Sequence, residues 1–288
     1  MKHTSLDTLM IRFSPLLLSL LSYALLVHTS VEASPDNKSA WILIDNFEEA
    51  SSMSDWIMAD VENDTDPHVS NPQITERRIE RSGNAYLIKK PAADGIVGNR
   101  KALTYFKLPV PIKRGEIATF YSRFNVESFP NNHIYGLSDL TPDQINKQAY
   151  NAFEPSLRIT DKEESNGFKN DGALMVKLGK GYDTIKIPQT GQSARPLEPG
   201  IWYQVWMVVD NRAAIEGGQT YDVYIQGGEF EKQTKVYSGA DFRMKREQDL
   251  IYFFANCNTG PIKQPYGNGG VLYDDFYLAN EILLTSPF

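Results

Sequence analysis

The stretch that decides the fold is Ile201-Trp202-Tyr203-Gln204-Val205-Trp206-Met207-Val208-Val209-Asp210. After a turn, the chain continues with Tyr221-Asp222-Val223-Tyr224-Ile225-Gln226-Gly227-Gly228. In both segments large side chains point alternately to two sides, which is the two-residue period of a β-strand. An aromatic-rich strand, a turn and a second strand ending in glycines predict a β-hairpin in the middle of a sheet.

Two acidic strands are predicted at the ends of the region that follows residue 40. The last is Leu272-Tyr273-Asp274-Asp275-Phe276-Tyr277-Leu278, and the first is Trp41-Ile42-Leu43-Ile44-Asp45-Asn46-Phe47. The first and last strands of all-β sandwiches are often neighbours. We therefore expect these two strands to pair and to close a single domain over residues 41–288.

Short β-branched and aromatic segments recur between these ends, separated by Gly, Pro, Asn and Asp. Further strands are predicted over residues 85–89, 102–107, 117–126, 134–137, 156–160, 173–178, 184–187 and 250–256. Short helical turns are predicted over 141–148 and 242–248, and long surface loops over 161–171 and 189–200. This pattern predicts an all-β fold, an antiparallel β-sandwich of the jelly-roll type.

The hairpin and the last strand resemble the laminin-G-like branch of the concanavalin A-like lectin/glucanase superfamily. In that branch a W-x-x-V-x-x-V-x-D strand, here Trp202 to Asp210, pairs with a Y-x-V-Y-x-x-G strand, here Tyr221 to Gly227. The domain then ends in an apolar-D-D strand, here at Asp274 and Asp275. The resemblance spans about residues 41 to 284 and is one of pattern. It implies a jelly roll of two antiparallel sheets, one of them concave.

Residues 1–33 are predicted to be a cleaved signal peptide. An apolar run from Pro15 to Val27 precedes a small-residue site at Val31-Glu32-Ala33. A membrane anchor is the alternative, but the run is shorter than the roughly 20 apolar residues that span a bilayer. We expect residues 34–40 to be a short linker and the protein to be secreted or periplasmic, without a membrane span after cleavage.

Charge and cysteine content narrow the class of partner. The chain has 29 Lys and Arg against 36 Asp and Glu, a net charge of −7, so it lacks the basic footprint of nucleic-acid binding. Cys257 is the only cysteine, which excludes a disulfide within the chain, and we expect it to be a small buried hydrophobe. The protein is predicted to be a monomer.

Strand alternation assigns a set of polar and aromatic residues to one outer face, provided that their strands share a sheet. Arg, Asn and Gln would supply planar hydrogen-bond partners and the aromatic rings would stack on sugars, which predicts a polysaccharide ligand on the concave face. The alternative is an ordinary solvated face, or one covered by the 161–171 loop. The set comprises Tyr121, Arg123, Asn125, His133, Tyr135, Arg158, Lys177, Gln204, Trp206 and Tyr224.

Three members of this set suggest an enzyme instead of a binding module. A lyase acting on an acidic glycan neutralises the substrate carboxylate, removes the adjacent proton and protonates the leaving oxygen. Arg123, His133 and Tyr135 are candidates for those roles, in that order. The leading hypothesis is a secreted carbohydrate-binding domain, and a polysaccharide lyase or glycosidase is the alternative; a plain loop position is the competing interpretation of His133.

A structural calcium site is predicted where the two chain ends meet. Calcium prefers hard oxygen ligands, which Asp45, Glu48, Asp274 and Asp275 would supply. Hydrogen bonding of these carboxylates to loop amides is the alternative. No other cofactor is expected.

Overall fold

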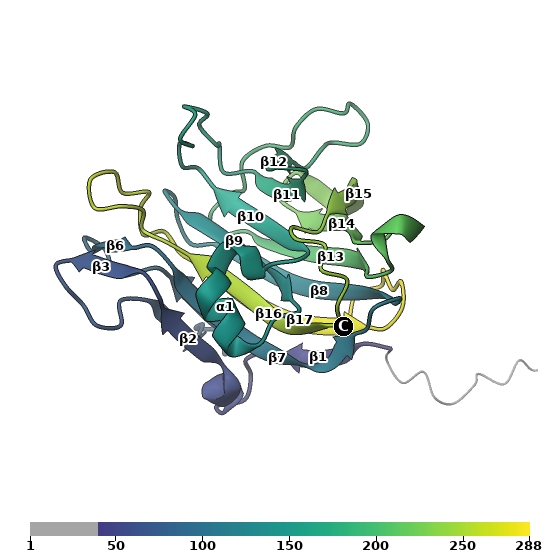
Figure 1. Ribbon diagram of the computed structural model, residues 1–288, viewed down its shortest axis with the longest axis horizontal. Helices are drawn as coiled ribbons and strands as arrows, with labels where there is room; N and C mark the ends of the chain where they lie inside the picture. The colour runs from purple at the N-terminus through teal and green to yellow at the C-terminus, as the bar shows by residue number, and fades with distance from the viewer. Residues whose placement is uncertain (1–39) are drawn as a thin grey trace, which may run out of the picture. The chain divides into compact units, whose positions relative to one another are not determined.

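The computed structural model describes residues 40–288, which form a sandwich of two antiparallel β-sheets (Figure 1). The predicted signal peptide and nearly all of the predicted linker lie outside the described residues. The eight-stranded sheet has the order β15-β14-β13-β8-β17-β5-β4, with β1 also paired to β17, and the seven-stranded sheet has the order β12-β11-β10-β9-β16-β7-β2. The all-β sandwich expected from the sequence is confirmed.

The strands of the eight-stranded sheet are β1 (Ile42–Asp45), β4 (Ile74–Ile79), β5 (Ala85–Lys90), β8 (Ile117–Val126), β13 (Trp202–Asp210), β14 (Thr220–Gly227), β15 (Phe230–Asp241) and β17 (Val271–Ala279). Those of the seven-stranded sheet are β2 (Ile57–Asp60), β7 (Ala102–Ile112), β9 (Asn132–Ser138), β10 (Ser156–Thr160), β11 (Leu174–Leu178), β12 (Gly181–Thr184) and β16 (Leu250–Cys257). A separate pair is formed by β3 (Asn63–Asp66) and β6 (Val97–Asn99). Helical segments are α1 (Pro142–Gln148) and the 3-10 turns η1 (Ser52–Asp55), η2 (Ala149–Ala152) and η3 (Ala214–Glu216).

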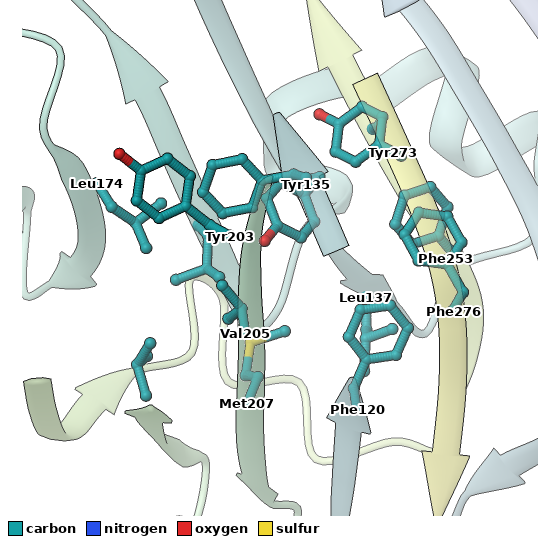
Figure 2. Close-up of a cluster of buried hydrophobic side chains, with 14 of the residues drawn as sticks. Phe120, Tyr135, Leu137, Leu174, Tyr203, Val205, Met207, Phe253, Tyr273 and Phe276 are labelled. Atoms are coloured by element: carbon teal, nitrogen blue, oxygen red, sulfur yellow. The ribbon is translucent and has the colours of Figure 1, made fainter. Parts of the chain in front are cut away.

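The core lies between the inner faces of the two sheets (Figure 2). Phe120 and Met207 from one sheet and Leu137 and Phe253 from the other are fully buried there. Phe120 and Phe253 stack with ring centroids 6.0 Å apart. Burial of this apolar surface is the main favourable contribution to folding.

The first and last strands pair as expected. Ile42 lies opposite Leu278, and Leu43 opposite Tyr277. The rings of Phe47 and Phe276 meet edge to face with centroids 5.8 Å apart. The hairpin of β13 and β14 is also confirmed, with Trp206 opposite Tyr224.

Helix α1 covers part of the outer face of the seven-stranded sheet, in front of β9 and β16 in Figure 1. The sequence predicts a turn here, and Thr141 and Gln144 form a capping box at its start. Ile145 is buried against a second apolar cluster that contains Ile134 and Phe254. This outer face is therefore apolar beneath α1 and η2 and polar beyond them.

The helical turn predicted over residues 242–248 is wrong. The backbone N–H groups of Met244, Lys245 and Arg246 all donate to the carboxylate of Glu154, at 3.0, 2.9 and 3.0 Å. A side chain from elsewhere thus satisfies the donors that a helix would have used. No helix among residues 40–288 is both long enough and apolar enough to cross a membrane.

Candidate functional site

A hollow of about 430 Å³ opens on the outer face of the seven-stranded sheet, beside η2. We call it the Arg158 groove. Its lining is rich in basic and aromatic side chains: Glu62, Arg100, Lys101, Asn132, Tyr150, Arg158, Lys162, Tyr182, Arg243, Asn258 and Tyr266.

Strand alternation places the floor of the groove. In β10, Leu157 and Ile159 point into the core, so Arg158 between them points outward. On the adjacent strand β9, Asn132 lies opposite Thr160 and also faces the groove. The backbone N–H of Asn258, just after β16, donates to the carbonyl oxygen of Asn132 at 3.3 Å, so the two amide side chains are neighbours.

Tyr150 is held in the middle of this floor by both amides. Its hydroxyl oxygen accepts from Nδ2 of Asn258 at 2.8 Å and from Nδ2 of Asn132 at 3.4 Å. The amide orientations are fixed, because Oδ1 of Asn132 accepts from Arg158 at 3.2 Å and Oδ1 of Asn258 accepts from the backbone N–H of Gly260 at 3.2 Å. Two donors therefore occupy the acceptor positions of the hydroxyl.

The hydroxyl proton of Tyr150 is consequently available for donation to a ligand in the groove. A tyrosine hydroxyl has one donor and two acceptor positions, and no hydrogen bond donated by Tyr150 is present within residues 40–288. Burial raises the pKa of Tyr150 to about 12, although the charge of Arg158 opposes that rise. At neutral pH the side chain is thus a proton donor.

Positive charge exceeds negative charge along the groove. Lys101 is paired with Glu62, and Arg158 and Lys162 share the single carboxylate of Glu164, at 2.7 and 2.8 Å. In addition, among the described residues Arg243 donates only to neutral oxygens, those of Asn151 at 3.1 Å and of the Tyr182 hydroxyl at 3.2 Å, and Arg100 is exposed. The chain is acidic as a whole, so this cationic surface is local.

Aromatic rings border the cations. The guanidinium carbon of Arg158 lies 4.9 Å from the ring centroid of Tyr182, and Nζ of Lys162 lies 4.7 Å from that of Tyr266. Cation–π contacts of this kind hold the basic side chains against flat rings. A planar anion or a sugar ring could bind between them.

A second hollow of about 470 Å³ continues the groove toward β12, the strand at the edge of the sheet. It shares Arg158, Tyr182 and Arg243 with the first and adds Phe168 and Lys180. Strands β12, β11, β10, β9, β16 and β7 lie side by side in this sheet, so a groove crossing them is about 24 Å long at the usual strand spacing. That length suits a polymer.

The prediction that the proposed site residues share one outer face is wrong. Strands β8, β13 and β14 belong to the eight-stranded sheet, whereas β9, β10 and β11 belong to the seven-stranded sheet. Of the predicted residues, Arg158 lines the groove. Lys177 is buried at its margin, where Nζ donates to the carbonyl oxygen of Gly179 and lies 5.8 Å from the Tyr182 ring.

The structure does not bring Arg123, His133 and Tyr135 together. His133 is buried with Nε2 2.9 Å from the carbonyl oxygen of Gly269, and burial lowers its pKa to about 3. Tyr135 belongs to the core between the sheets (Figure 2). Arg123 lies on the outer face of the other sheet, paired with Asp275 at 2.7 Å.

The side chains of β9 therefore point to the opposite sides of the sheet from those expected. Alternation placed Ile134 in the core, but Ile134 is buried on the outer face by the cover that α1 and η2 provide. His133 and Tyr135 then point inward. When both faces of a strand are covered, neither set of side chains is polar, so the sequence does not show which set points into the core.

The aromatic face predicted on the eight-stranded sheet is covered by the last residues of the chain. The indole Nε1 of Trp206 donates to the carbonyl oxygen of Thr285 at 3.1 Å, and both Trp206 and Tyr121 are buried. Tyr121 donates to Oε1 of Gln204 at 3.0 Å. Tyr224 is half-buried beside the same cluster.

Asn125, the remaining residue of that face that was predicted to bind a sugar, also has a partner in the protein. Asn125 is buried and its Oδ1 accepts from the backbone N–H of Gly200 at 3.0 Å. These side chains stabilise the sheet and its covering segment. They offer no open platform for a sugar.

The four carboxylates proposed for calcium have other partners. Both oxygens of Asp45 accept hydrogen bonds, from the backbone N–H of Phe47 at 2.8 Å and from the indole of Trp56 at 2.9 Å. Asp274 accepts from Asn84 at 3.2 Å and Asp275 from Arg123.

Glu48 accepts from the backbone N–H of Ala85 at 3.0 Å. Within residues 40–288 no group of three or more His, Cys, Asp or Glu side chains is arranged to hold a metal ion. Asp45, Glu48 and Asp274 thus accept backbone N–H groups, as the alternative expected, whereas Asp275 is paired with the cationic Arg123, which does not suit calcium. Cys257 is buried, as expected.

Sequence reasoning missed most of the groove. Tyr150, Lys162 and Arg243 lie in η2 and in loops, where no strand period assigns a direction. The only available signal was the spacing of basic and aromatic residues in the 161–171 loop and after β15. Their convergence depends on tertiary structure.

Comparison with known proteins shows a likeness of fold alone. No family model and no curated protein matches the sequence. Among solved structures, the chain is similar to a marine PL-14 alginate lyase from Aplysia kurodai (11% identity, 83% of this chain and 98% of that chain, TM-score 0.48). It is also similar to a winged bean acidic lectin complexed with methyl-α-D-galactose (13%, 83% and 96%, 0.46) and to a GH131 β-glucanase catalytic domain from Podospora anserina (12%, 70% and 74%, 0.43). These structures belong to the concanavalin A-like group of lectins and glycan-active enzymes that the strand motifs resemble.

Proposed function

We propose that the chain binds an acidic polysaccharide in the Arg158 groove. The observation that carries this proposal is the surplus of cationic side chains over carboxylates along the groove, where Arg243 is bonded only to neutral oxygens of residues 40–288. Guanidinium groups bind planar carboxylates through paired hydrogen bonds. An anionic ligand also matches the charge of this surface better than a neutral one.

The aromatic lining favours a glycan over a simple anion. Tyr182 and Tyr266 present rings beside the cations Arg158 and Lys162. Aromatic faces give apolar contact to the C–H surface of sugar rings, while the amides of Asn132 and Asn258 lie below. A chain of uronate units would offer both surfaces at once.

Retention on immobilised polysaccharides tests the proposal. The protein is passed over an acidic polymer and a neutral polymer of similar length at low and at high salt. We expect retention on the acidic polymer that falls with salt, because exposed ionic contacts are screened. Equal retention on both polymers, or none on either, would contradict the proposal.

Eliminative cleavage of the bound polymer is a second candidate function. It is favoured by the orientation of Tyr150, whose hydroxyl oxygen is bonded to two amides and whose proton has no acceptor among residues 40–288. In the phenolate form Tyr150 would take the proton next to the uronate carboxylate, with Arg158 and Asn132 near enough to stabilise the developing charge.

The step then completes on the same residue. The C–O bond to the leaving sugar breaks, a C=C bond forms beside the carboxylate, and the new hydroxyl of Tyr150 returns its proton to the leaving oxygen. This course requires the removed proton and the leaving oxygen to lie on one face of the sugar. Cleavage gives an unsaturated sugar end, which absorbs ultraviolet light, so a rise in absorbance with the wild-type protein and none with Tyr150→Phe tests it.

A further inference from the structure

One carboxylate of the protein already sits among the cations of the groove. Oε1 of Glu164 lies 2.7 Å from Nη1 of Arg158, and Oε2 lies 2.8 Å from Nζ of Lys162. Nδ2 of Asn170 donates to Oε1 at 2.9 Å. A carboxylate that bridges an arginine and a lysine has the contacts that a bound uronate would make.

The loop that carries Glu164 is built to present it. The backbone N–H of Glu164 donates to the carbonyl oxygen of Phe168 at 2.7 Å, and that of Asn170 donates to the carbonyl oxygen of Lys162 at 3.0 Å. These bonds make a short hairpin over the groove margin. Burial acts to raise the pKa of Glu164, but Lys162 and Arg158 outweigh it and lower the pKa to about 2, so the group is anionic at neutral pH.

We infer that Glu164 is a specificity-determining residue that occupies the place of a ligand carboxylate and restricts the groove to polymeric acids. This inference rests on the proposed function. A tethered carboxylate competes at an effective concentration in the millimolar range or higher, as for groups joined by short linkers. A single free uronate gains only the contacts that it takes from Glu164.

A polymer is in a different position. It also reaches Arg243 and Arg100, which have no carboxylate partner within residues 40–288, and it does so without a further loss of translational freedom. A polymer can bind through those contacts without displacing Glu164, whereas a single uronate that binds Arg158 must displace it. The carboxylate therefore weakens short acids far more than long ones.

The test measures the affinity of uronic acid oligomers, from the monomer to the hexamer, for the wild type and for Glu164→Gln. We expect the monomer and dimer to bind the variant roughly tenfold more tightly, in proportion to one freed charge-assisted contact. The hexamer should gain less than the monomer. Glu163→Gln is the matched control, because it removes the same charge from an exposed neighbouring side chain.

Two further measurements separate the effect of the charge of Glu164 from an effect on folding. Glu164→Asp keeps the charge and should keep the wild-type preference for long oligomers, and thermal unfolding of each variant shows that the fold is retained. If Glu164→Gln binds the monomer no better than the wild type does, or if Glu163→Gln gives the same gain, the inference is wrong while the proposed function stands. If the wild type and all three variants fail to bind every acidic oligomer and polymer, the proposed function itself is wrong.

Discussion

The side chains of Tyr150 and Asn258, 108 positions apart in the sequence, meet through a hydrogen bond of 2.8 Å on the floor of the groove. Asn258 is positioned in turn by the backbone of Gly260. The bond therefore links η2 to the end of β16 and directs the tyrosine proton outward.

Replacement of Arg158 by glutamine should weaken binding of the acidic polymer. Arg158 contacts the amide floor directly, donating to Oδ1 of Asn132 at 3.2 Å. Loss of one charge-assisted hydrogen bond of about 1.5–3 kcal/mol corresponds to roughly a 10- to 150-fold loss of affinity. Isothermal titration with an acidic oligosaccharide measures this change. Arg81→Gln, at an exposed turn after β4, is the control that should bind like the wild type.

Replacement of Tyr150 by phenylalanine should separate cleavage from binding. Removal of the hydroxyl takes away the proposed proton carrier, and general acid–base groups contribute about 10²- to 10⁴-fold to rate. Retention on the acidic polymer should stay close to that of the wild type. If the variant still forms unsaturated product at the wild-type rate, Tyr150 has no part in the chemistry.

The rate of cleavage by the wild type should rise with pH. The pKa of Tyr150 is about 12, so the phenolate fraction increases about tenfold for each pH unit below that value. Initial rates from pH 7 to pH 10 with absorbance detection measure the slope. A rate that is flat across this range would rule out the phenolate as the base.

Replacement of Trp206 by alanine should affect stability and leave glycan binding intact. Trp206 is 1% exposed and packs beneath the segment that includes Thr285. Truncation of a buried Trp typically costs about 3–5 kcal/mol of unfolding free energy. Chemical denaturation measures the loss. A large drop in polymer retention by the folded variant would return the eight-stranded sheet to consideration as the binding face.

Replacement of Asp274 by asparagine should flatten the pH dependence of stability. Burial, followed by the charge of Asp275, raises the pKa of Asp274 from its ordinary value of 3.8 to about 7 in the folded protein. The folded state thus binds more protons than the unfolded state between those values. The contribution of Asp274 is fully favourable below about pH 4 and is lost as the pH rises toward 7.

The melting temperature of wild type and Asp274→Asn from pH 4 to pH 8 tests this assignment. The difference between the two proteins should shift in favour of the variant as the pH increases. A constant difference would mean that Asp274 ionises normally in the folded state.

The sequence predicted the framework of this protein because strand signals are local. The alternation in residues 202–210 and 221–227 fixes a hairpin whatever surrounds it, and the pairing of Leu43 with Tyr277 follows from a general property of sandwiches. The strand β15 was missed because it is an edge strand with two lysines, Lys232 and Lys235, and few buried positions. Charged edges of that kind discourage aggregation but also hide the strand signal.

The site was harder to predict because it depends on which sheet each strand joins. Arg158 was identified from alternation alone, since both neighbours in β10 are apolar and buried. His133 and Tyr135 were misplaced because α1 buries Ile134 from outside, a contact between segments that no local period encodes. Tyr150, in η2, acquires its role only when Asn132 and Asn258 are brought beneath it.

The direction of the groove has a consequence for how recognition is divided. Because it crosses the seven-stranded sheet, Tyr182, Arg158 and Asn132 come from three different strands, β12, β10 and β9. Successive sugar units of a bound polymer would each contact side chains of a different strand. A change in one strand would then alter preference at one unit and leave its neighbours untouched, so that the pattern of acceptable sugars can vary position by position on a constant scaffold.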